Sequence, residues 1–345
     1  MNKGYTHKSR RTTPWDEKAH RTPMQEFLHQ HYSTRYDDRH PLLSETGETQ
    51  LINSYIPKAC PHCTSENYKM SGRTKNGVQR YKCTVCFQTF TPVTNTIFED
   101  HKISLSEWIE YVLNIFRYVS VNADSWNNRN AFTTSRYWLE KLFITLESYQ
   151  HDFIFTDQVW LDETFYSVRS SDIIKTEEGN KLRGLSSNQM CIGVVCDKNR
   201  TLCIFEGYGK PSQKKTYESF KDHIAIRSTI IHDKENAHKK LVKELHLNSI
   251  VYDSKKIKHL NDKDNPLNRV NRIHNLLKGF LYAHTSFNRD SIQGYLNLFS
   301  FVMNPPDNHL EKVEVLMDLA FRNPKTLRYR EFYRVKQAST APPCK

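Results

Sequence analysis

The chain has 345 residues and a formal net charge of +12, from 50 Lys and Arg against 38 Asp and Glu. This excess favours an acidic polymer as partner, most simply nucleic acid, although a merely soluble basic protein has the same composition. No apolar run approaches the roughly 18 residues of a membrane span, and the N-terminus lacks the apolar core of a secretory signal. We therefore expect a cytoplasmic protein with no membrane partner.

The first segment, residues 1–55, is polar and rich in His, Arg and Thr, with little periodicity. This composition predicts a basic, flexible arm, and a charge run of this kind is more often a solvated tail than a binding site. Within the arm, Thr22 followed by Pro23 predicts the start of a short helix. Thr is a common N-cap residue, and Pro fits the first helical position.

Residues 56–100 contain two C-x-x-C pairs with the spacing of a zinc ribbon. The four predicted Zn²⁺ ligands are Cys60, Cys63, Cys83 and Cys86. Four thiolates leave no open coordination position, so the zinc is expected to be structural. A pair of redox motifs is the less favoured alternative, because the two pairs bracket a predicted β-hairpin.

The hairpin between the two pairs turns at residues 75–77. It carries basic side chains that we expect to contact DNA phosphates, although many ribbons bind protein instead: Lys69, Arg73, Lys75, Arg80 and Lys82.

Residues 101–150 show helical periodicity. Ser104 and Glu107 resemble a capping box, and a second helix is predicted from Thr133 to about Tyr149, with a short helix between them. This order is compatible with a helix-turn-helix whose last helix presents Arg136 to DNA. The alternative is a plain helical linker packed on the core.

From residue 151 to about 310 the pattern becomes α/β. Short β-branched or aromatic runs predict strands at 159–167, 189–196, 201–206, 228–232 and 249–252. Helical patterns follow at 214–223, 237–245, 270–282 and 291–303. A meander of three strands followed by alternating strands and helices predicts a ribonuclease H-like domain. Residues 311–345 are predicted to form a basic C-terminal tail.

Asp162 lies in the middle of the first apolar strand of this domain. A buried, ionised carboxylate is costly unless it is paired or bound to a metal. Asp233 follows the fourth strand, and in a parallel arrangement the two aspartates can end side by side as ligands of divalent metal ions. The competing interpretation of Asp233 is a helix N-cap. Asp253 and, less favoured, Asp197 are competing ligands.

A third ligand is expected from the helix at 270–282, which contains no Asp or Glu. Asn271, His274 and Lys278 share one face at i, i+3 and i+7. We predict that His274 is the third ligand of Mg²⁺ or Mn²⁺, and that Lys278 and Asn271 contact DNA. A lone His on a helix is more often structural, but this face is unusually polar for a core. A neutral imidazole suits Mn²⁺ better than Mg²⁺.

Over roughly residues 57–305 the chain resembles bacterial insertion-sequence transposases of the IS1595 type (ISXO2-like). The resemblance rests on the order of the cysteine pairs and four later segments: Trp160 to Thr164, Ile231 to Asp233, Asn268 to His274 and Gly294 to Phe299. It implies a zinc ribbon followed by a ribonuclease H-like catalytic domain of the DDE type, with Asp162 and Asp233 as the first two catalytic residues. His274 stands where many relatives have Glu, and some subgroups carry a non-acidic residue with a nearby Lys, which Lys278 matches.

The resemblance implies a nucleoid-associated enzyme that cuts the ends of an insertion sequence and joins them to target DNA, using Mg²⁺ or Mn²⁺. The expected partners are terminal inverted repeats, target DNA and further copies of the same chain, because two ends must be joined in one complex. Two alternatives remain. One is a transposase-derived regulator that binds DNA without cutting it, and the other is a stand-alone nuclease.

Overall fold

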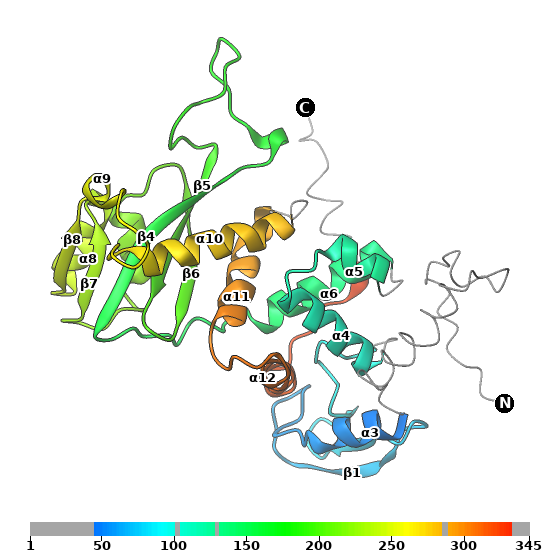
Figure 1. Ribbon diagram of the computed structural model, residues 1–345. Helices are drawn as coiled ribbons and strands as arrows, with labels where there is room; N and C mark the ends of the chain where they lie inside the picture. Colours follow the sequence, from blue (N-terminus) through cyan, green and yellow to red (C-terminus); the bar gives the residue numbers. More distant parts are fainter. Residues whose placement is uncertain (1–44, 101–103, 128–130, 285–288, 333–345) are drawn as a thin grey trace, which may run out of the picture. The chain divides into compact units, whose positions relative to one another are not determined.

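The computed structural model describes residues 45–100, 104–127, 131–284 and 289–332 (Figure 1). The chain divides into two compact units, one from residues 1–145 and 309–345 and the other from residues 146–308. The predicted helix start at Thr22 lies outside the described residues. Within the described residues, no helix is both long and apolar enough to cross a bilayer.

The first unit begins with a helix and a small sheet. The helix is α3 (Glu45–Ser54), and the antiparallel strands are β1 (Tyr68–Arg73), β2 (Gln79–Cys83) and β3 (Thr89–Phe90), in the order β1-β2-β3. The predicted hairpin is therefore present. The prediction of a flexible arm is wrong for residues 45–54. Asn53 ties α3 to the hairpin by accepting from the Gln79 N–H at 2.8 Å and donating to the Gly77 carbonyl at 3.2 Å.

Four further helices lie in the described part of this unit: α4 (Leu105–Phe116), α5 (Val121–Asn127), α6 (Phe132–Thr145) and α12 (His309–Arg322). Ser104 caps α4, as predicted, by accepting from the Glu107 N–H at 3.2 Å. The prediction of a tail from residue 311 is wrong for α12, whose buried stripe includes Val313, Leu316 and Met317. This stripe packs against α4 and α6, so the segment is ordered by burial of its apolar face.

The second unit is built on a mixed five-stranded sheet. Its strands are β4 (Gln158–Ser167), β5 (Gln189–Cys196), β6 (Thr201–Tyr208), β7 (Thr229–Asp233) and β8 (Asn248–Tyr252), in the order β6-β5-β4-β7-β8. β4, β5 and β6 form an antiparallel meander, while β7 and β8 run parallel to β4. The sequence therefore predicted all five strands.

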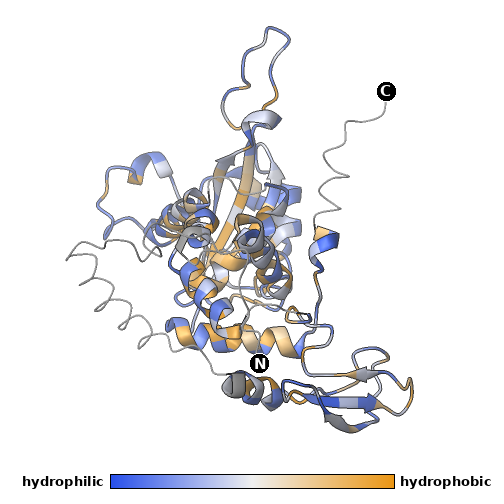
Figure 2. Cartoon of the chain, turned by 90° about the vertical axis from the view of Figure 1, so that its right-hand side faces the viewer, coloured by the Kyte–Doolittle hydropathy of each residue, from blue (hydrophilic) through white to orange (hydrophobic). Residues whose placement is uncertain are grey.

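Helices complete this unit: α7 (Gln213–Phe220), α8 (Lys239–Glu244), α9 (Ser254–Ile257), α10 (Asn268–Ala283) and α11 (Ile292–Met303). Val159 and Leu161 of β4 pack with Phe220 of α7 and Leu241 of α8 in one buried core. α10 packs against β4 and β5, and α11 against β6. The core strands are largely hydrophobic in Figure 2.

Side-chain alternation along β4 decides where the polar residues of this strand lie. Residues 159 and 161 point into the core beneath α7 and α8, so Glu163 follows them onto that face. Trp160 and Asp162 point to the other face. There the indole N–H of Trp160 donates to the Pro266 carbonyl at 3.0 Å, just before α10 begins. Asp162 therefore lies on the α10 side of the sheet.

Candidate functional site

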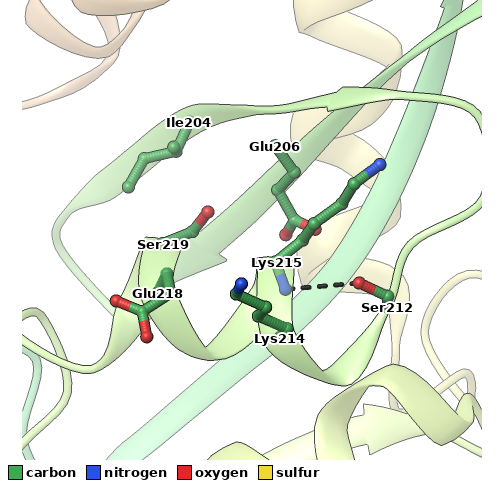
Figure 3. A pocket seen from close by; sticks show the side chains of 7 residues that line it. All are labelled: Ile204, Glu206, Ser212, Lys214, Lys215, Glu218 and Ser219. Atoms are coloured by element: carbon green, nitrogen blue, oxygen red, sulfur yellow. Dashed lines mark hydrogen bonds between the residues drawn. The ribbon is translucent and has the colours of Figure 1, made fainter.

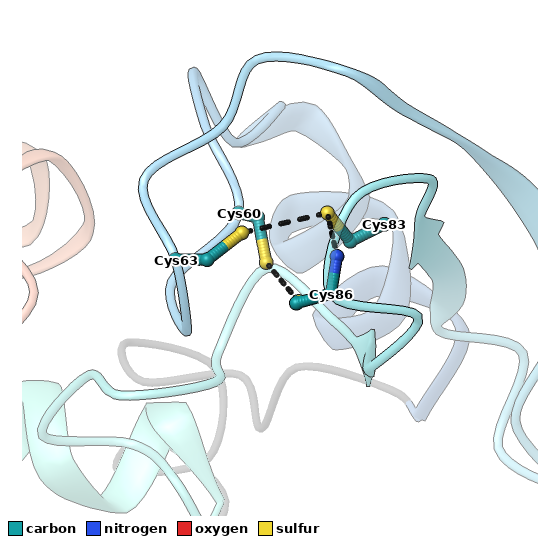
Figure 4. Close-up of side chains that lie close together, drawn as sticks. All are labelled: Cys60, Cys63, Cys83 and Cys86. Atoms are coloured by element: carbon teal, nitrogen blue, oxygen red, sulfur yellow. Dashed lines mark hydrogen bonds between the residues drawn. The ribbon is translucent and has the colours of Figure 1, made fainter.

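The four predicted zinc ligands lie together. Their sulfur atoms all lie within 4.8 Å of one another, with Cys60 and Cys86 3.7 Å apart and Cys63 and Cys83 3.6 Å apart (Figure 4). The Cys86 and Val85 N–H groups donate to the Cys83 sulfur and lower the pKa of that thiol to about 6. Thiolates are the form that binds zinc. The cluster is thus compatible with a closed, structural Zn²⁺ site.

The basic residues of the ribbon hairpin lie on its two longer strands and the turn. Lys69, Arg73, Lys75 and Arg80 are exposed and Lys82 is half-buried. Lys69 and Lys82 are directly opposite each other in the register of β1 and β2. Like charges at such positions destabilise a sheet. An anion bound between them would relieve this repulsion.

Asp162 lies next to His274. One carboxylate oxygen (Oδ1) accepts from the Glu163 N–H at 2.9 Å, and the other (Oδ2) lies 4.0 Å from His274 Nδ1. Burial, then the charges of Asp233 and Glu163, raise the pKa of Asp162 to about 7. About a fifth of the side chain stays exposed. A carboxylate held in this way gains strongly from a cation.

Asp233 ends β7, beside Asp162. In the parallel pairing of β4 and β7, Leu161 is the partner of His232, so the two aspartates are the next residues on adjacent strands. Asp233 Oδ1 accepts from the Glu235 N–H at 3.0 Å, and Ser254 donates to Oδ2 at 3.4 Å.

Local contacts bear on the competing interpretations of the aspartates. Glu235 caps the 3-10 turn Asn236–His238 by accepting from the Asn236 N–H, while Asp233 accepts from the Glu235 N–H just before this turn. Asp253 caps α9 through the Lys255 N–H at 3.0 Å. Asp197 closes the turn between β5 and β6 and pairs with Arg200 at 3.6 Å. Asp253 and Asp197 therefore have structural roles.

α10 brings His274 to Asp162. His274 is buried, and its Nε2 has no hydrogen-bond partner among the described residues. Burial, then the charge of Lys278, lowers the pKa of His274 to about 4, so the imidazole is neutral at physiological pH. Lys278 is exposed one turn further on, and Asn271 is half-buried one turn earlier. The ring nitrogen near Asp162 is Nδ1, and a neutral imidazole can bind a metal ion through either nitrogen.

The three predicted ligands are only partly brought together. Among the described residues, two groups place three or more possible ligand atoms within 4.8 Å of one another: the four cysteines, and Asp233 with His232 and His238. Asp162, Asp233 and His274 do not converge that closely. The sequence analysis missed both histidines, although His232 directly precedes Asp233 and His238 follows five residues later.

A cavity of about 710 Å³ lies elsewhere in this unit (Figure 3). Its lining consists of Ile204, Glu206, Ser212, Lys214, Lys215, Glu218 and Ser219. Burial, then the charge of Glu163, raises the pKa of Glu206 to about 8, while Thr216 donates to this carboxyl group at 3.1 Å. None of the predicted site residues lines this cavity.

No protein-family model matches the chain, and no curated protein matches it either. A solved structure described as "Crystal structure of the Mos1 Strand Transfer Complex" is similar over 64% of this chain and 78% of that chain, with 11% identity and a TM-score of 0.27. A likeness at this TM-score supports neither a family nor a role, so both depend on the residues of this chain.

Proposed function

We propose that the protein is a DNA transposase that uses divalent metal ions to cleave the ends of an insertion sequence and join them to target DNA. The observation that carries this proposal is the position of Asp162 and Asp233 on adjacent parallel strands, with His274 Nδ1 4.0 Å from the carboxylate of Asp162. Burial, then the charge of Asp233, raises the pKa of Asp162, and a bound cation would favour the ionised carboxylate.

We further propose that residues 146–308 form a ribonuclease H-like domain of an IS1595-type transposase. The strand order supports this, since an antiparallel meander is followed by two strands parallel to its first strand. The order of the sequence motifs is the other support. In this interpretation Asp162 and Asp233 are the first two members of a DDE-type set, and His274 takes the third place.

The residues at the site fit divalent ions. The carboxylates of Asp162 and Asp233 supply the oxygen ligands that Mg²⁺ and Mn²⁺ take, and the imidazole of His274 favours Mn²⁺. Bound divalent ions would polarise the scissile phosphate and activate the attacking oxygen. Lys278, exposed on the same face of α10, would hold a neighbouring phosphate, and Asn271 would contact the strand nearby.

The ribbon is proposed to bind DNA. Lys69 and Lys82 supply a pair of opposed charges that a phosphate can bridge. Arg73, Lys75 and Arg80 extend this basic surface, and Zn²⁺ at the cysteines would hold the hairpin in shape. Arg136 of α6 is a further proposed contact. Recognition of two terminal inverted repeats in one complex would require more than one copy of the chain.

The test is strand cleavage of DNA that flanks the coding region, with Mg²⁺ or Mn²⁺. We expect cleavage by the wild type, none by Asp162→Ala, and wild-type cleavage by Asp253→Ala. Asp253 is a matched control because it ends the neighbouring strand and only caps α9. Full activity of the Asp162 variant would refute the assignment. Cleavage without strand joining would indicate a stand-alone nuclease.

The second candidate is a regulator that binds DNA without cutting it, favoured by one observation: α10 places His274, not a carboxylate, beside Asp162. This candidate predicts sequence-specific binding that is indifferent to Asp162→Ala, and no cleavage with either ion. Short inverted repeats on both sides of the coding region would favour the transposase.

A further inference from the structure

The face of the sheet opposite Asp162 holds a buried carboxylate–imidazole pair. Glu163, the residue after Asp162, turns its carboxylate toward His238, whose Nε2 lies 3.0 Å and 3.2 Å from the two carboxylate oxygens. The side chain of His238 is fully buried, and that of Glu163 is 3% exposed. A carboxylate buried this deeply requires its partner.

The pair continues as a chain of hydrogen bonds. His238 Nδ1 lies 2.8 Å from His232 Nδ1, and His232 Nε2 lies 2.9 Å from the hydroxyl of Ser249. His238 Nε2 donates to Glu163. Of the two facing Nδ1 atoms, one donates and the other accepts. The chain thus joins β4, the turn 236–238, β7 and β8, which are the elements that surround the two aspartates.

Backbone groups next to Glu163 and His238 hold the two aspartates. The backbone N–H of Glu163 donates to Asp162 Oδ1 at 2.9 Å. The backbone N–H of Glu235, at the start of the turn that carries His238, donates to Asp233 Oδ1 at 3.0 Å. A shift of either β4 or this turn would therefore move an aspartate oxygen along with it.

We propose that Glu163 and His238 are positioning residues, which fix β4 and the turn after β7 so that Asp162 and Asp233 present their carboxylates to one divalent ion. This inference rests on the proposed function. Neither residue contacts DNA or the ion in this account. They act by holding the two backbone N–H groups that orient the aspartates. Groups that orient metal ligands typically affect metal affinity by about 10- to 100-fold.

The diagnostic variant is Glu163→Gln, which keeps the size of the side chain and one oxygen acceptor for His238 but removes the charge that holds the pair. We expect Mn²⁺ affinity, measured by isothermal titration without DNA, to fall about tenfold or more. The Mn²⁺ concentration that gives half-maximal cleavage should rise by the same factor. The affinity for DNA should not change.

The matched control is Thr216→Val, which removes a buried hydrogen bond to Glu206 on the same face of the sheet. It should lower the midpoint of urea unfolding and leave Mn²⁺ affinity unchanged. Equal loss of Mn²⁺ affinity in the two variants would show a general packing role and overturn the inference. Unchanged Mn²⁺ affinity in Glu163→Gln would overturn it as well.

If Glu163→Gln does not fold, Ser249→Ala tests the inference instead. It removes only the last hydrogen bond of the series and leaves the contact between Glu163 and His238 intact. A threefold or greater loss of Mn²⁺ affinity supports the inference, and a smaller change contradicts it. Failure of the proposed function is a separate result. It would appear as absence of metal-dependent cleavage in the wild type, whereas failure of this inference leaves that cleavage in place.

Discussion

Replacing Asp162 with Asn should stabilise the α/β unit when divalent ions are absent. Burial and the nearby Asp233 and Glu163 raise the pKa of Asp162 from 3.8 to about 7. A change of about 3 pKa units corresponds to at most about 4 kcal/mol of unfavourable free energy for the ionised form. A fifth of the side chain remains exposed, so solvent reduces this value. Asn keeps the acceptor for the Glu163 N–H and carries no charge.

The stability gained by Asp162→Asn should depend on pH. Between pH 4 and pH 7 the folded protein binds more protons at Asp162 than the unfolded chain does, so the free energy of unfolding of the wild type falls as pH rises. The Asn variant lacks this slope. The variant should match the wild type near pH 4 and exceed it most above pH 7. Urea unfolding at pH 4.5 and pH 8, after dialysis into buffer without divalent ions, measures both differences.

Mn²⁺ should reduce this difference in stability by stabilising the wild type. An ion that binds only the folded wild type stabilises it by about 2.7 kcal/mol at a concentration 100 times its Kd. Asp162→Asn removes a ligand, so Mn²⁺ should add little to its stability. The reasoning would be refuted by a variant that is no more stable than the wild type at pH 8, or by equal stabilisation of both proteins by Mn²⁺.

Three further predictions concern the cysteine cluster, Lys141 and two glycines. Cys63→Ser removes one thiolate, so the zinc content should fall and the ribbon hairpin should lose its amide protection from hydrogen exchange; a variant that retains both would contradict the site. Burial lowers the pKa of Lys141 to about 8, so the unfolded chain binds more protons above pH 8 and the free energy of unfolding should rise from pH 8 to pH 10. Lys141→Met should abolish this rise in urea titrations, and an unchanged slope would exclude Lys141 as its source. Gly193→Ala should cost about 1–3 kcal/mol, because its Cβ would lie 2.3 Å from Glu206 Oε1. Gly279→Ala, whose Cβ meets nothing within 4 Å in α10, should gain about 0.5–1 kcal/mol in the same urea assay, and equal effects would contradict the packing.

Much of the fold could be predicted from local sequence patterns. The C-x-x-C spacing predicted the sulfur cluster, and short β-branched and aromatic runs predicted every strand of the larger sheet, because such runs are visible in the residues themselves. The position of Asp162 in such a run predicted a site on β4, and that site stays a prediction. In each of these cases the signal lies within one short segment.

Contacts between distant segments could not be predicted in this way. α12 is amphipathic, but only its packing against α4 and α6 explains why a basic C-terminal segment is helical. Glu163 and His238 are 75 residues apart, and neither stands out from its neighbours until the fold brings them together. The close approach of Asp233 to His232 and His238, rather than to His274, likewise depends on the turn that follows β7.

The most direct test of the central claim is X-ray diffraction at the manganese absorption edge from crystals equilibrated with Mn²⁺. We predict an anomalous peak bonded to carboxylate oxygens of both Asp162 and Asp233, and loss of that peak in crystals of Asp162→Asn. Absence of any peak between the two aspartates at saturating Mn²⁺, or a peak that survives in the variant, would contradict the account.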